Sequence, residues 1–220
     1  MGTHPVFLCL AGRRCVVLGG DEAAAGKALA CRTAGAHVLV VAEQVPPVLQ
    51  HAIAERRMQH LARAYRVGDL AGAFLCYASL RDPVAIASAR EEARRERVLL
   101  NVVDVPEACD FFAPAVVARG ALQIAVGTDG KSPAAASRVR DRIAREIGAE
   151  FGTMVEILGE VRRTLAGRAD RPDVLRALAQ SELPELLRRC DLAAVDRLLT
   201  TTAGDDCSLE RLGIVPEAGR

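Results

Sequence analysis

The first half of the chain alternates short apolar runs with helical stretches that carry regularly spaced charges. The apolar runs predict strands over residues 15–18, 37–42, 98–103 and, more weakly, 61–65 and 74–78. The stretches between them predict helices over residues 23–34, 48–57 and 83–96. The run at 37–42 is almost continuously apolar, which is typical of a strand covered on both faces of a parallel sheet. This alternation predicts a Rossmann-type α/β fold with right-handed crossovers over residues 1–113.

The pattern changes after Phe111. Two apolar runs, 115–118 and 122–126, lie on either side of Arg119-Gly120-Ala121, a link that suits a hairpin. Ser132 and Pro133 then have the order of an N-cap and a first helical residue, which predicts a helix reaching to about residue 150. We therefore expect a separate segment over 114–150 between the sheet and the rest of the chain.

Residues 151–220 predict a small all-helical subdomain. Its first helix has an apolar face at helical spacing, formed by Met154, Ile157, Leu158, Val161 and Leu165. Shorter helices are expected over 173–180, 183–190 and 193–199, and the last twenty residues are expected to form a loose tail.

Composition excludes several classes of protein. The 220 residues are 50% hydrophobic, and their net charge of +1 lacks the basic excess of most nucleic-acid-binding proteins. No apolar run is long enough to cross a membrane, and the N-terminus lacks the pattern of a signal peptide, so we expect a cytoplasmic protein. The seven cysteines form no C-x-x-C pair and are expected to be mostly reduced core residues.

The turn after the first strand is the strongest chemical signal. Gly19-Gly20 ends an apolar run, and an alanine-rich helix follows immediately, as in the phosphate-binding turn of dinucleotide-binding proteins. The middle glycine of the G-x-G-x-x-G/A pattern is Asp21, whose negative charge would repel a phosphate. The alternative, that the glycines only permit a tight turn, remains open.

Two acidic residues follow predicted strands at the edge where such sheets bind ligands. Glu43 has the spacing of an acid that binds the adenosine ribose of NAD, and the absence of a nearby arginine disfavours NADP. It is equally well explained as a solvated acid. Asp104 has the position of a general base, but Asp104 with Glu107 also has the form of a capping box, and the residues alone favour the cap.

The remaining candidates carry weaker signals. The turn over 128–133 combines glycine, Lys131 and a helix start, which suits either an acidic substrate group or a plain helix N-terminus. The four histidines show no metal-ligand spacing. The charged stretch 90–97 is expected to be a solvated helix face.

Taken together, the motifs resemble those of the precorrin-2 dehydrogenase family, which includes the N-terminal module of sirohaem synthase. The resemblance runs from residue 4 to about residue 147, and the helices after 151 are similar to the tail of stand-alone members. The residues that carry it are His4-Pro5-Val6-Phe7, Gly12-Arg13, Gly19-Gly20 with Lys27, Asn101-Val102-Val103-Asp104, Phe111-x-x-Pro114, and Gly130-Lys131-Ser132-Pro133 with Arg138 and Arg140.

The resemblance implies NAD-dependent removal of two hydrogens from precorrin-2, which gives sirohydrochlorin; some members also insert a metal. It implies that Asp104 is the base, and a metal-handling carboxylate if the chain is a chelatase. The implied NAD-binding residues are Gly19, Gly20, Glu22, Ala23, Glu43, Gln44 and Ser79. The implied binding residues for the carboxylate-rich substrate are Asn101, Arg119, Lys131, Ser132 and Arg138. It further implies a homodimer formed through the segment after Phe111.

Four positions depart from the family pattern. Asp21 and Asp129 replace glycines, Ser79-Leu80 replaces a Thr-Asp pair, and Ala85 replaces an asparagine. Three of these departures surround the expected NAD cleft, so they predict weaker cofactor binding rather than a different fold. Two alternatives therefore stay open: a sirohydrochlorin chelatase with weakened NAD binding, and a non-catalytic tetrapyrrole-binding protein.

Overall fold

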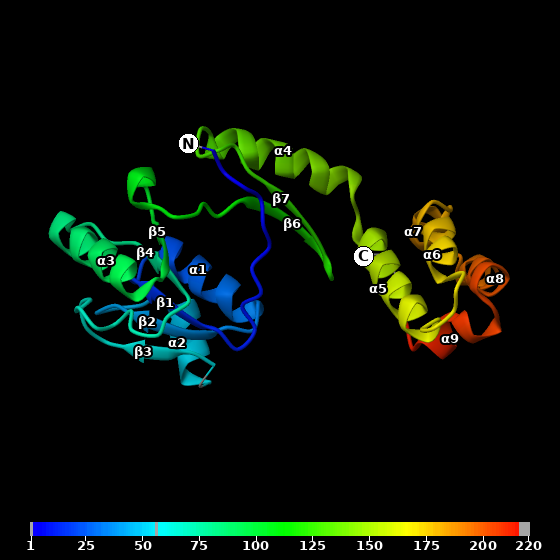
Figure 1. Ribbon diagram of the computed structural model, residues 1–220, viewed down its shortest axis with the longest axis horizontal. Helices are drawn as coiled ribbons and strands as arrows, with labels where there is room; N and C mark the ends of the chain where they lie inside the picture. The colour runs from blue at the N-terminus through cyan, green and yellow to red at the C-terminus, as the bar shows by residue number, and fades with distance from the viewer. Residues whose placement is uncertain (1, 56, 216–220) are drawn as a thin grey trace. The chain divides into compact units, whose positions relative to one another are not determined.

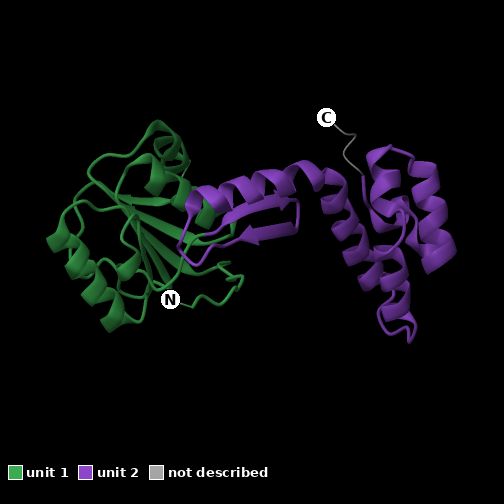
Figure 2. Ribbon diagram, turned by 90° about the horizontal axis from the view of Figure 1, so that it is seen from above, with its two compact units in different colours: residues 1–113 green, residues 114–220 purple. Residues whose placement is uncertain are grey.

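The computed structural model describes residues 2–55 and 57–215. Residue 56, inside the helix expected over 48–57, and the last five residues of the expected tail lie outside the described part. The chain divides into two compact units, residues 1–113 and 114–220 (Figure 2).

Unit 1 is built on a five-stranded parallel sheet with the order β3-β2-β1-β4-β5 (Figure 1). Val17 in the central strand pairs with Val40 on one side and with Tyr77 on the other. The predicted parallel Rossmann-type sheet is therefore confirmed. Its strands are β1 (Arg14–Leu18), β2 (His37–Val41), β3 (Gln59–Leu61), β4 (Leu75–Ala78) and β5 (Leu99–Val102).

The strand expected over 61–65 was wrong in position. Strand β3 pairs with β2 only as far as Leu61, and the chain then leaves the sheet. In this segment the backbone N–H groups of residues 66, 68 and 70 donate hydrogen bonds to the carboxylates of Asp69 and Glu92 and not to a neighbouring strand.

Helices cover both faces of the sheet. Helices α1 (Glu22–Thr33) and α2 (Pro47–Ala54) pack on one face, and α3 (Pro83–Glu96) packs on the other. The buried positions of α1 are all small: Ala24, Ala25, Ala28 and Cys31. Because small side chains let a helix approach a sheet closely, a chain with 3% aromatic residues still forms a dense core here.

Unit 2 begins with a hairpin of β6 (Ala115–Arg119) and β7 (Leu122–Val126), packed against α4 (Pro133–Glu146). The predicted hairpin is confirmed, and because Arg119 itself pairs with Leu122, its turn is one residue shorter than the expected link. Helix α4 ends before the expected residue 150, because Gly148 caps a new helix, α5 (Ala149–Thr164). The Arg119 guanidinium donates hydrogen bonds to the carbonyls of Ala144 and Ile147 and so satisfies the end of α4.

The rest of unit 2 is a helical bundle around α5. The apolar face predicted for this helix is confirmed, because Ile157, Val161 and Leu165 are buried in the bundle core. The other helices are α6 (Arg171–Ala179), α7 (Leu183–Arg188), α8 (Leu192–Ala203) and α9 (Leu209–Leu212). A loose tail was expected from residue 201 onward. This expectation was wrong for the residues up to the end of α9, because Leu209 and Leu212 are buried in the bundle core.

All seven cysteines are free, and Cys15, Cys31, Cys76 and Cys207 are buried. Within residues 2–55 and 57–215, no helix has the length and apolarity that a membrane crossing requires.

Candidate functional site

A cleft of about 400 Å³ opens at the carboxyl edge of the sheet in unit 1. This is the edge at which open α/β sheets bind ligands, and the volume lies within the usual range for ligand clefts. Segments that follow β1, β2, β3 and β4 form its walls. The lining residues are Gly19, Gly20, Val41, Ala42, Glu43, Gln44, Ala64, Tyr65, Leu80, Arg81, Asp82 and Ala85.

Both glycines of the turn are required by the chain's own packing. Gly19 has a φ of +109°, and a Cβ at this position would collide with the carbonyl oxygen of Ser79. A Cβ at Gly20 would collide with the carbonyl oxygen of Gln44. The turn passes so close to the ends of β2 and β4 that only glycine fits. The tight-turn interpretation is therefore sufficient for these two residues.

Asp21 is the N-cap of α1. Its Oδ1 accepts a hydrogen bond from the Ala24 N–H at 2.8 Å, and its Oδ2 accepts one from the Ser79 hydroxyl at 2.7 Å. The carboxylate thus occupies a helix N-terminus that would otherwise be available to a phosphate. Its partial burial acts to raise the pKa, but the hydrogen bonds from Ser79 and Ala24 and the nearby charge of Arg81 outweigh burial and lower it.

Replacing Asp21 tests this competition directly. We expect Asp21→Gly to bind NAD roughly 5- to 30-fold more tightly, because about 1–2 kcal/mol of repulsion with the diphosphate is removed. Asp21→Asn should show part of the gain, since asparagine keeps the cap but not the charge. Titration calorimetry measures both, with Glu91→Gln on exposed α3 surface as the charge control. Unchanged NAD affinity in both variants would show that Asp21 does not face the phosphates.

The other residues expected to bind cofactor lie around the same edge. Glu43 and Gln44 line the cleft, whereas Glu22 and Ala23 form the exposed first turn of α1. Ser79 faces Asp21. One arginine, Arg81, lines the same cleft as Glu43, although 38 positions separate the two residues in the sequence.

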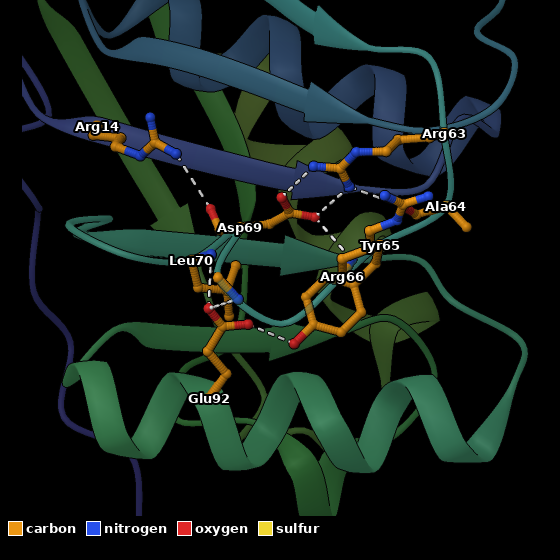
Figure 3. Close-up of polar contacts among 9 residues, drawn as sticks. Arg14, Arg63, Ala64, Tyr65, Arg66, Asp69, Leu70 and Glu92 are labelled. Carbon is orange, nitrogen blue, oxygen red and sulfur yellow. Dashed lines mark hydrogen bonds and ion pairs between the residues drawn. The ribbon is translucent and has the colours of Figure 1, made fainter.

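A buried carboxylate fixes the Tyr65 wall of the cleft. Glu92 of α3 is 1% exposed and accepts hydrogen bonds from Tyr65 Oη at 2.5 Å, Gly68 N at 2.8 Å and Leu70 N at 3.1 Å (Figure 3). The expectation of a solvated face over 90–97 was therefore wrong for Glu92. Burial, followed by the hydrogen bond to Glu92, raises the pKa of the Tyr65 phenol. Tyr65 is thus held as a neutral hydrogen-bond donor.

Asp69 fixes the same loop from its other side. Its carboxylate forms a two-pronged ion pair with the Arg63 guanidinium, at 2.7 and 2.8 Å, and also accepts the Arg66 N–H (Figure 3). The hydrogen bond from Arg63 lowers the pKa of Asp69, although partial burial opposes the shift.

The lowered pKa of Asp69 predicts a pH dependence of folding. The folded chain holds this proton less tightly than the unfolded chain does, so the ion pair stabilises the fold above the ordinary carboxyl value of 3.8. That contribution should disappear as the pH falls through the folded-state pKa. Urea unfolding between pH 6 and about pH 2 should show a steeper acid loss for the wild type than for Asp69→Asn; parallel curves would contradict the assignment.

Asp104 lies two residues beyond β5 at the carboxyl edge of the sheet. It is exposed and has a φ of +60°, a left-handed conformation that costs energy for most residues. The capping-box interpretation was wrong, because the short 3-10 helix at Pro106–Ala108 starts from Val105 and has no side-chain cap. In the described part of the chain, no hydrogen bond or ion pair involves the Asp104 carboxylate, which is open to a ligand.

The loop after Asp104 folds back along β5 and is pinned to it. Asp110 accepts a hydrogen bond from Leu100 N at 2.9 Å and donates its own N–H to the Leu100 carbonyl. Asn101, which is 8% exposed, donates to the Phe111 carbonyl at 2.9 Å. Asn101 is therefore a positioning residue for the segment that follows Asp104, and its amide faces the protein interior.

Four residues expected to bind substrate belong to unit 2. Arg119 is engaged at the end of α4, as described above, and Ser132 caps the start of α4 by accepting the Ala135 N–H at 3.2 Å. Lys131 and Arg138 are exposed. No ion pair involves either side chain in the part of the chain that the structure describes, so both cations are available to an acidic ligand. Asp129 has a φ of +55°, a left-handed conformation that favours glycine.

Across residues 2–55 and 57–215, no group of three His, Cys, Asp or Glu side chains is arranged to hold a metal ion.

Sequence reasoning missed Tyr65 and Arg81 as cleft residues. Their positions could have indicated this role, because each residue lies within four residues after the end of a strand, at the carboxyl edge of the sheet.

A parallel sheet, a glycine turn leading into α1 and a cleft at the carboxyl edge define a dinucleotide-binding Rossmann domain. Comparison with known families agrees. Residues 6–115 match the family described as "Putative NAD(P)-binding", and residues 119–146 match the central domain of sirohaem biosynthesis proteins. The chain belongs to this NAD(P)-binding family, joined to a sirohaem-biosynthesis central domain.

Curated relatives include two siroheme synthases. That of Methylobacillus flagellatus is 36% identical over 168 residues, which cover 76% of this chain and 36% of the relative. That of Azotobacter vinelandii is 34% identical over 199 residues, covering 89% and 43%. The chain thus spans less than half the length of these relatives. The solved structure of SirC, precorrin-2 dehydrogenase, has the same fold, with a TM-score of 0.73, 21% identity and coverage of 89% of this chain and all of that one.

Proposed function

We propose that the protein catalyses the NAD-dependent dehydrogenation of precorrin-2 to sirohydrochlorin, with Asp104 as the base. The observation that carries the proposal is the exposed Asp104 carboxylate, which has no partner among the described residues and is held in a left-handed turn at the same sheet edge as the dinucleotide cleft. The names of the relatives, siroheme synthase and precorrin-2 dehydrogenase, support the substrate class.

The residues of the cleft fit a dinucleotide, and Glu43 supports NAD in particular. Glu43 follows β2 and lines the cleft, where its carboxylate can accept hydrogen bonds from the ribose hydroxyls of NAD. Tyr65 and Leu80 provide apolar surface for a flat base. At the turn expected to receive the phosphates, the Asp21 carboxylate carries an opposing charge.

In this mechanism, bound NAD supplies the acceptor for a hydride that leaves the macrocycle. Asp104 removes the accompanying proton from the macrocycle and later releases it to solvent. Asn101 and the pinned segment 109–111 keep the Asp104 turn in place. Lys131 and Arg138 attract the substrate carboxylates by charge.

The test is an anaerobic assay with precorrin-2 and NAD that follows NADH absorbance. We expect NADH and sirohydrochlorin in equal amounts. Ferrous or cobalt ion is then added to a parallel sample with sirohydrochlorin. Metal insertion without any NADH formation would replace the dehydrogenase proposal with the chelatase alternative.

We also propose that two copies of the chain associate through the hairpin. A two-stranded sheet is marginally stable alone, and Val116 of β6 and Val139 of α4 remain 41% and 47% exposed. Sedimentation should give a dimer, and Val116→Asp should weaken it; a monomeric wild type at micromolar concentration would exclude the dimer.

Seven free cysteines support a reducing, cytoplasmic location.

A further inference from the structure

We propose that Arg81 binds the diphosphate of the dinucleotide and thereby replaces the contact that α1 would otherwise provide. The inference rests on the proposed dinucleotide cofactor and adds a binding residue for its phosphates. It addresses the main conflict in the site, which is a carboxylate at the position where a phosphate is expected.

The first observation is that Asp21 has taken the usual phosphate donor. The Ala24 N–H points to Asp21 Oδ1 at 2.8 Å, and the Ser79 hydroxyl holds the second oxygen at 2.7 Å. Any phosphate that approached this helix N-terminus would meet a carboxylate with its hydrogen bonds already made. A compensating cation is therefore needed beside the turn.

The second observation is that Arg81 provides this cation. It follows β4, lines the same cleft as Gly19 and Gly20, and is exposed. It is the one cationic residue among the described residues that line the cleft. No hydrogen bond or ion pair of its guanidinium is formed within residues 2–55 and 57–215, yet its charge lies close enough to lower the pKa of Asp21.

The chemistry and the location both favour the diphosphate over a 2′-phosphate. A guanidinium can donate two parallel hydrogen bonds to a phosphate, and the exposed Arg81 has no partner within the described part of the chain. Arg81 lines the same cleft as Gly19 and Gly20, which form the turn where a Rossmann domain receives the diphosphate. A 2′-phosphate would instead lie beside the residue that follows β2, which is Glu43, and its carboxylate would repel it.

The test compares the binding of NAD, NADP, ADP and adenosine to the wild type and to Arg81→Gln by titration calorimetry. We expect Arg81→Gln to weaken NAD and ADP about tenfold and to leave adenosine unchanged, because adenosine has no phosphate. The tenfold difference should shrink between 20 mM and 500 mM salt. Arg94→Gln, an exposed arginine in the last turn of α3, makes the same charge change away from the cleft and should have no effect.

Two results would overturn the inference while leaving the proposed function intact. One is equal NAD affinity in the wild type and Arg81→Gln. The other is a loss confined to NADP, which would assign Arg81 to the 2′-phosphate. If the wild type binds neither NAD nor ADP, the proposed function itself fails, and the role proposed for Arg81 fails because there is no diphosphate for it to bind. Combining Asp21→Gly with Arg81→Gln should restore much of the lost affinity, since the helix N–H then becomes available.

Discussion

Asp104→Asn should reduce the turnover of precorrin-2 by about 10²- to 10⁴-fold, the usual contribution of a positioned acid–base group. Asparagine is nearly the same size and tolerates the left-handed φ of +60°, so the loop should keep its fold. Only the ability to accept a proton is removed. NAD affinity should stay at the wild-type value, because Asp104 is not among the residues that line the cleft.

The matched control is Glu107→Gln, which changes the same charge on the same exposed segment. Its side chain has no role in the proposed chemistry, so its turnover should be normal. Single-turnover NADH formation measures the chemical step, and calorimetry measures NAD binding. Wild-type turnover in Asp104→Asn would remove Asp104 from the role of base. A loss of NAD binding in parallel with activity would instead indicate a change in the fold of the site.

Glu92→Ala should lower the free energy of unfolding of unit 1 by about 3 kcal/mol or more. The change leaves one hydroxyl and two backbone N–H groups without their acceptor, and unsatisfied buried donors are costly. Tyr65→Phe removes only the hydroxyl, so its cost should be nearer 1 kcal/mol. Urea unfolding monitored by circular dichroism measures both changes.

Glu91→Ala, the exposed neighbour on the same helix, is the control and should be within about 0.5 kcal/mol of the wild type. Since Tyr65 lines the cleft, Glu92→Ala should also weaken adenosine binding, whereas Glu91→Ala should not. Equal stability of the two glutamate variants would show that the loop does not depend on this buried carboxylate.

Much of the fold could be predicted from residue pattern, because the sheet of unit 1 is buried on both faces. Apolar runs such as the one at 37–42 have few alternatives to a central strand. Strand β3 was harder, since Gln59 and Leu61 are exposed and the strand has only three residues. The final helices were missed because their core contacts come from single residues such as Cys207 and Leu212, which give no periodic signal in so short a segment.

The candidate site was predictable where it depends on local sequence and not where it depends on distant pairing. The glycine turn and the Asp104 motif are each contiguous in the chain. Asp21 pairs with Ser79, 58 residues away, and Glu92 accepts from Tyr65, 27 residues away. A charged helix gives no sign of which of its glutamates is buried, since that depends on the loop packed against it.

The close approach of the glycine turn to Ser79 and Gln44 has a consequence for how relatives of this chain diverge. Selection for the fold alone is enough to keep Gly19 and Gly20, because any side chain there collides with the backbone of the same unit. A descendant that had stopped using a dinucleotide would therefore still carry both glycines. Positions 21 and 81 are free of that constraint, so their joint variation across lineages records whether the cofactor is still under selection.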